Sequence, residues 1–89
     1  MKLLTEVDMN EAERQKLVIQ AIINELHTST LKYGCFKSTH EAYGVLKEEV
    51  DEMWDACKCN NIVEMEEEAI QVAAMAIRFI IDARRSKGL

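Results

Sequence analysis

Carboxylates are crowded into one short segment of the sequence, YGVLKEEVDEMWDA at residues 43–56. Five acids fall within eight positions: Glu48, Glu49, Asp51, Glu52 and Asp55. Glu49 and Glu52 are three residues apart, so on a helix they project from neighbouring turns of one face and can chelate one cation or two adjacent ones. Like charges at such spacings repel each other, so either the acids form a solvated face or a positive ion lies between them.

A second pair of oxygen-bearing side chains follows in the segment EEEAIQVAAM. Glu68 and Gln71 are again three residues apart, and both adjoin apolar residues. If the two segments form helices that pack side by side, all four side chains could face one cavity, as in helical bundles that hold divalent metals. Oxygen ligands of this kind suit Mg²⁺ or Mn²⁺. We therefore predict a metal site formed by Glu49, Glu52, Glu68 and Gln71.

The alternative is an acidic surface without a ligand. Glutamate-rich helices are common, and most E-x-x-E pairs belong to solvated faces. Gln71 favours a site, because an amide within an otherwise apolar helix is costly to bury without a partner. We expect it either to be hydrogen-bonded within the core or to belong to a polar site.

Three helices can position these side chains. The sequence has no proline and only three glycines, which favours helices over turns. The first predicted helix covers residues 11–33, with Asn10 as its N-cap and Gly34 as its stop signal. The second covers residues 39–58 and starts at a Ser38–Glu41 capping box. Its apolar stripe contains Leu46, Val50, Met53, Trp54 and Cys57, and we expect Trp54 to lie in the core or at a subunit interface.

The third predicted helix covers residues 62–86, and its segment 69–81 is apolar on nearly every side. A helix that is apolar all round is buried all round. Three helices of one chain each leave a side exposed to water, so we expect a partner chain to cover part of this helix. The fold prediction is a single all-α domain over residues 1–89, a helical bundle completed by oligomerisation.

Composition limits the possible partners. The net charge is -5 and the basic residues are scattered, which argues against binding to nucleic acid or to an anionic membrane surface. The longest apolar run, residues 72–77, is far shorter than the roughly 20 residues of a membrane span. Three cysteines without a preceding secretory signal favour a reducing compartment, and we expect a cytoplasmic protein.

The segments LKEEVDEMWDA and EEEAIQVAAMAIRF together resemble the two metal-binding motifs of MazG-like, all-α nucleotide pyrophosphohydrolases. In that family one helix carries E-x-x-E and a later helix carries E-x-x-D. The resemblance covers residues 36–81, about half of the chain, and extends to the short MazG-like proteins of phages and prophages. It implies a helical bundle completed by dimerisation or tetramerisation. It also implies Mg²⁺-dependent hydrolysis of nucleoside or deoxynucleoside triphosphates to monophosphate and pyrophosphate.

The resemblance assigns roles to individual residues. Glu49 and Glu52 match the first motif, Glu68 matches the first acid of the second, and Glu48 matches an adjacent acid that is frequent in the family. Mg²⁺ held by Glu49, Glu52 and Glu68 would neutralise charge on the phosphate oxygens and lower the pKa of a bound water. Glu48 or Glu49 would orient that water or accept its proton. The resemblance also makes Phe36 and His40 candidates for contacts with the base of the substrate. The alternatives are a core aromatic for Phe36 and a surface residue at the helix start for His40.

Gln71 departs from the family pattern, because it occupies the place of the aspartate of the second motif. Its amide oxygen can bind a metal but carries no charge, so weaker metal affinity or lost activity should follow. The second hypothesis is therefore a catalytically degenerate MazG-like oligomer that serves as a binding or regulatory module. A third is a helical oligomerisation protein with a solvated acidic face, which leaves Gln71 unexplained.

Overall fold

The computed structural model describes residues 8–87, and within them all regular structure is helical. The helices are α1 (Glu11–Tyr33), α2 (Thr39–Lys58) and α3 (Ile62–Lys87). The predicted all-α class and the three predicted helices are confirmed, with α3 ending one residue later than expected. Within the same residues, no helix combines the length and apolar character that crossing a bilayer requires.

Side-chain caps explain where the helices begin. The Asn10 side chain accepts a hydrogen bond from the Glu13 amide at 2.9 Å, and the Glu13 carboxylate accepts one from the Asn10 amide at 3.4 Å, which completes a capping box on α1. At α2 only half of the predicted box forms: Ser38 caps the Glu41 amide, but the Glu41 carboxylate accepts from the amide of Lys37. These caps satisfy amides that have no partner within the helix.

Two residues with positive φ separate the helices. Gly34 has φ 69° and ends α1, its amide donating to the Thr30 carbonyl at 2.9 Å. Asn60 has φ 54° in the turn between α2 and α3, a conformation that asparagine tolerates better than most residues. The next residue, Asn61, caps α3 by accepting from the Glu64 amide at 3.1 Å.

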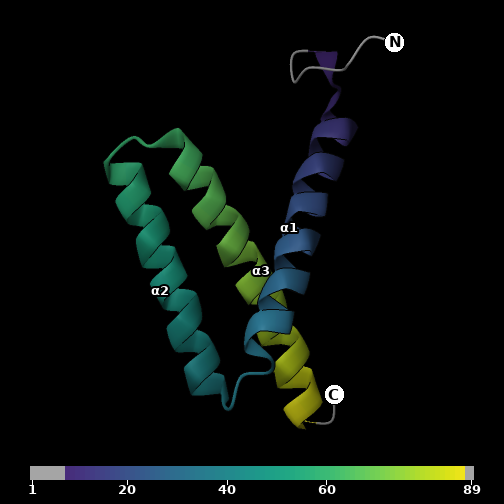
Figure 1. Cartoon of the computed structure of the whole chain (residues 1–89), viewed down its shortest axis with the longest axis vertical. Coiled ribbons are helices and arrows are strands. Elements are labelled where there is room, and N and C mark those ends of the chain that lie inside the picture. The colour runs from purple at the N-terminus through teal and green to yellow at the C-terminus, as the bar shows by residue number, and fades with distance from the viewer. Residues whose placement is uncertain (1–7, 88–89) are drawn as a thin grey trace.

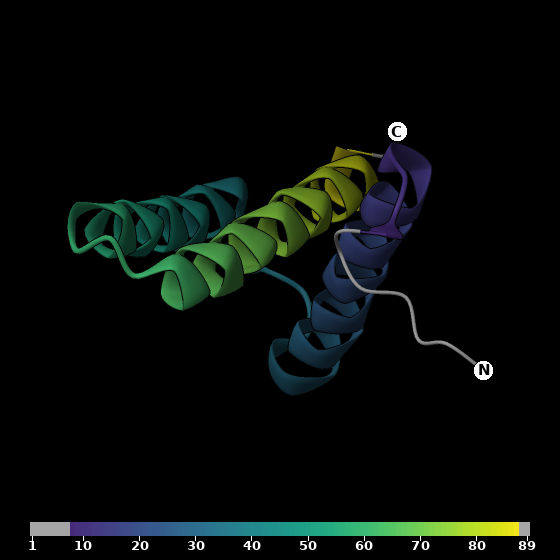
Figure 2. The same cartoon turned by 90° about the horizontal axis from the view of Figure 1, so that it is seen from above.

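α3 is the central element of the fold (Figures 1 and 2). α2 and α3 form an antiparallel hairpin and lie side by side along their length. α1 packs against α3 on the side away from α2, and the two outer helices hardly touch each other. The acids on α2 and α3 are therefore carried by the most closely packed pair of helices.

The core of the chain is small. Among the described residues, the buried apolar side chains are Ala42, Ala56, Ala74 and Met75. Two members of the predicted stripe on α2 lie outside this core, since Val50 is 39% and Trp54 61% exposed. For Trp54 this leaves the second expectation, a subunit interface. At 100° per residue, Ala42, Glu49 and Ala56 share the face toward α3, and Trp54 is turned away from it. Small alanines let the two helices approach closely.

Candidate metal centre

Three carboxylates converge between α2 and α3. One oxygen each from Glu49, Glu52 and Glu68 lies within 4.8 Å of the other two. The hairpin explains this convergence. Glu52 lies six residues before the last residue of α2, and Glu68 lies six residues after the first residue of α3. Antiparallel neighbours place positions equally far from their connection side by side.

Two of these carboxylates carry oxygens that are shielded from water. Glu49 and Glu68 are half-buried, whereas Glu52 is exposed. The Oε2 atoms of Glu49 and Glu68 are buried and have no hydrogen-bond partner. None of the ion pairs among residues 8–87 involves the three acids. Buried polar atoms are rarely left without a partner, so this arrangement calls for a proton or a cation.

The pKa values of the cluster reflect this environment. Burial raises the pKa of Glu49 from 4.5 to about 7, with further contributions from the charge of Glu52, the neighbouring Glu68 carboxyl and the charge of Glu25 on α1. The pKa of Glu68 is also raised, chiefly by burial. Crowded carboxyl groups titrate together. Without a cation, the cluster holds a proton near neutral pH.

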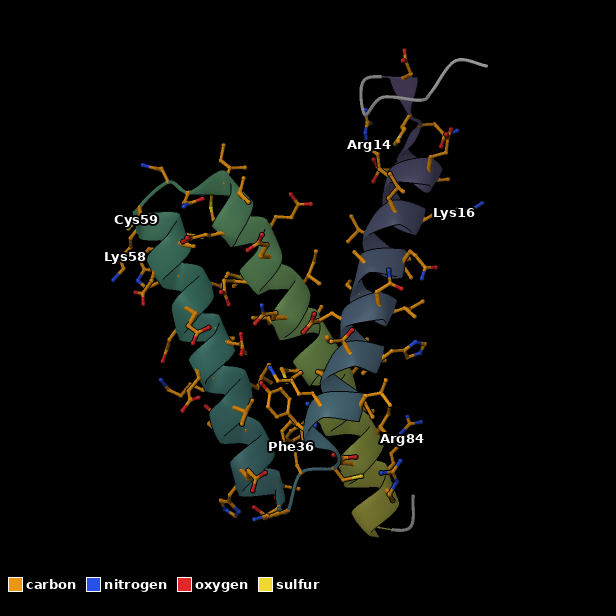
Figure 3. All side chains as sticks on the ribbon, viewed as in Figure 1. Arg14, Lys16, Phe36, Lys58, Cys59 and Arg84 are labelled. Atoms are coloured by element: carbon orange, nitrogen blue, oxygen red, sulfur yellow. The ribbon has the colours of Figure 1, made fainter. Side chains whose placement is uncertain are left out.

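Glu49 also borders a cavity of about 510 Å³ that receives side chains from all three helices. Gln71, Met75 and Arg78 line it from α3, at spacings that place them on one face of that helix with Glu68. Lys32 and Phe36 line it near the end of α1. In Figure 3, Phe36 lies between α2 and the adjoining ends of α1 and α3. The volume is within the range of small-molecule sites.

Arg78 holds one side of this cavity in place. Its side chain is only 4% exposed, and its Nη2 donates to the Gly34 carbonyl oxygen. Its Nη1 donates to Met75 Sδ at 3.7 Å, and the guanidinium carbon lies 4.4 Å from the centre of the Phe36 ring. The amide of Phe36 donates to the Asp82 carboxylate at 2.9 Å. Polar groups of α3 therefore fix the segment that follows α1.

The predicted site residues fall into two groups. Glu49, Glu52 and Glu68 lie together, and Gln71 and Phe36 share the cavity that Glu49 borders. Glu48 and His40 are exposed and do not line this cavity. Their predicted roles, like those of the other site residues, stay predictions.

Glu25 was not among the site residues predicted from the sequence. This half-buried residue of α1 lines the cavity together with Glu49 and Gln71. A signal was present, because Glu25 lies between Ile22 and Leu26 on the apolar side of α1 and four residues before the buried Ser29. A carboxylate within an apolar stripe needs a charged or polar partner.

No protein-family model, curated protein or solved structure matches the chain. The resemblance to MazG-like enzymes therefore rests on the motif residues themselves, and the family assignment stays a prediction.

Proposed function

We propose that the protein is a metal-dependent nucleoside triphosphate pyrophosphohydrolase, which converts an NTP or dNTP to the monophosphate and pyrophosphate. The observation that carries this proposal is the convergence of Glu49, Glu52 and Glu68 beside a cavity of about 510 Å³. Acids at these positions match the motif acids of MazG-like enzymes. The cavity has room for part or all of a nucleotide.

The chemistry of the three acids fits a hard divalent cation. Their ligand atoms are all carboxylate oxygens, and the Oε2 atoms of Glu49 and Glu68 lack a hydrogen-bond partner. Oxygen donors with open positions for water are the preferred surroundings of Mg²⁺, with Mn²⁺ as a close substitute. When bound, such an ion offsets phosphate charge and acidifies water.

The remaining steps belong to side chains of the chain itself. Of the two predicted proton acceptors, Glu49 borders the cavity and is better placed than the exposed Glu48 to orient a water toward phosphorus. Lys32 lines the same cavity and offers a positive charge to phosphate oxygens. The base would lie near Phe36, and the exposed His40 at the start of α2 would contact it only outside this cavity.

We also propose that the active form is a homo-oligomer, a dimer or tetramer. Large apolar side chains are exposed on every helix, among them Leu17, Ile19, Val50, Trp54, Ile80 and Ile81. A second copy that covered these surfaces would enlarge the small core.

The competing function is a degenerate MazG-like scaffold that binds or regulates without turnover. Gln71 favours it, because a neutral amide occupies the place of an aspartate. The deciding experiment incubates the purified chain with the common NTPs and dNTPs, in Mg²⁺ or Mn²⁺, and measures pyrophosphate release. We expect release with at least one substrate and its loss in Glu52→Gln, while Glu11→Gln, on the first turn of α1, retains it. Absence of release across the panel would contradict the enzymatic proposal.

A further inference from the structure

Three negative charges of the centre come from α2 and α3, and the fourth expected ligand, Gln71, is neutral. If two cations bind, as the spacing of the acids allows, extra negative charge on the protein offsets the repulsion between them. A further carboxylate near Gln71 would provide it. Among the described residues, Glu25 on α1 offers such a carboxylate.

Glu25 on α1 and Gln71 on α3 line the same two cavities. Both line the 510 Å³ cavity and both also line a neighbouring cavity of about 450 Å³, so the two side chains lie along the boundary between these spaces. Glu49 borders only the larger one of the two, on the side of α2. Three oxygen-bearing side chains, one from each helix, therefore line the larger cavity.

Neither Glu25 nor Gln71 is committed to another partner. Within residues 8–87, no side-chain hydrogen bond or ion pair involves either of them. One of the two expectations for Gln71, a hydrogen bond within the core, is therefore not met in this part of the chain. The buried Oε2 of Glu49 also lacks a partner.

We infer that Glu25 is the fourth carboxylate of the metal centre, acting on a divalent cation at the cavity side of Glu49 and replacing the charge that Gln71 lacks. This inference rests on the proposed function, since it concerns the same centre. It assigns the two cation positions different surroundings: Glu49, Glu52 and Glu68 at one, and Glu49, Gln71 and Glu25 at the other. The second position would require α1 to stay packed on α3.

The test is a titration of the full chain with Mn²⁺ at pH 7.5. Calorimetry and the electron paramagnetic resonance signal of free Mn²⁺ measure the binding. We expect Glu25→Gln to weaken binding at one of two positions on the order of tenfold or more. Glu11→Gln removes the same charge from the first turn of α1, away from the cavity, and should bind like the wild type. The double variant Glu25→Gln/Gln71→Asp places a carboxylate on α3 instead of α1, on the opposite side of the same cation position. Its affinity for Mn²⁺ should recover.

The outcomes separate the two proposals. If the wild type binds Mn²⁺ and Glu25→Gln binds it with the same affinity and stoichiometry, the inference about Glu25 is wrong and the proposed function stands. If the wild type binds no Mn²⁺, both are wrong. A structural role of Glu25 predicts a third pattern, in which Gln71→Asp tightens Mn²⁺ binding by the same factor in the wild type and in Glu25→Gln. A shared cation position predicts a larger factor in Glu25→Gln, so equal factors would also overturn the inference. Thermal unfolding without Mn²⁺ checks that each variant is folded.

Discussion

Glu49 on α2 and Glu68 on α3 each point an oxygen, Oε2, into a space that neither water nor a hydrogen-bond donor of the described chain reaches. Two carboxylates in this relationship repel each other when both are ionised. The closely packed contact between α2 and α3 thus contains two carboxyl groups that cannot both ionise without an energetic cost. The stability of the protein should depend on what neutralises them.

Without divalent cations, we predict that the protein becomes less stable as the pH rises. The folded-state pKa of Glu49, about 7, lies above its ordinary value of 4.5, so the folded chain binds this proton more tightly than the unfolded chain. The free energy of unfolding should therefore fall between about pH 4.5 and pH 7. Partial exposure of Glu49 screens and reduces the effect.

Urea unfolding in a chelating buffer at pH 5.5 and pH 8 measures this change. Glu49→Gln removes the titrating group, so its stability should decrease less over the same interval. Mg²⁺ added at pH 8 should restore stability to the wild type but not to this variant, because a ligand that binds only the folded state stabilises it. Equal pH dependence in both proteins would contradict the assignment to Glu49.

Gln71→Asp distinguishes a weakened enzyme from an inactive scaffold. In an enzyme, the added carboxylate should tighten Mg²⁺ binding and raise the rate of pyrophosphate release, because charge replaces a neutral oxygen. In a scaffold, the same change should only lower stability, since it places an unpaired charge beside Ile70 and Val72. Calorimetric Mg²⁺ titration and the pyrophosphate assay on one preparation give both answers, with Gln71→Asn as the neutral control.

Arg78→Met should destabilise the fold by about 2–3 kcal/mol, because the buried guanidinium donates to the Gly34 carbonyl and covers the Phe36 ring. The exposed Arg84 is the matched control, and Arg84→Met should change the free energy of unfolding by less than about 0.5 kcal/mol. Urea unfolding followed by circular dichroism gives both values. Equal losses in the two variants would show that the contacts of Arg78 add little.

The predicted oligomer depends on exposed apolar side chains, of which Trp54 on α2 is 61% exposed. We expect light scattering of the wild type at micromolar concentration to give the mass of a dimer or tetramer. Trp54→Glu should shift the mass toward the monomer, because a charge at a subunit contact is costly to bury. Lys16→Glu, on an exposed part of α1, is the control (Figure 3). A monomeric wild type would refute the prediction.

The sequence predicted the helices well because their ends are encoded locally, by Asn10, Ser38 and Asn61 at the starts and by Gly34 at the first stop. Spacing also placed Glu49 and Glu52 on neighbouring turns. Hydrophobicity did not identify the buried face of α2: Trp54 is large and apolar but exposed, whereas Glu49 shares the face of Ala42 and Ala56. The direction of that face depends on how α2 packs on α3, which no local pattern specifies.

Glu25 was missed for a related reason. Its position relative to Glu49 depends on the crossing of α1 over α3, a contact between segments some 45 residues apart in the sequence. Spacing within one helix carries no information about such a crossing. The capping box predicted at α2 was half right, since the Glu41 carboxylate accepts from Lys37 instead of Ser38, a choice that depends on the path of the chain before the helix.

The unequal packing of the three helices also bears on how the molecule folds and fluctuates. α2 and α3 are joined by three residues, 59–61, and pair along their length, so their contacts span shorter sequence separations on average than those between α1 and α3 and favour earlier formation of the hairpin. α1 packs on α3 alone. Partial unfolding would therefore begin with detachment of α1 from an intact hairpin. Such an opening would keep the acids of α2 and α3 together while removing Glu25 and one wall of the cavity, so amide exchange in α1 would also report on access to the site.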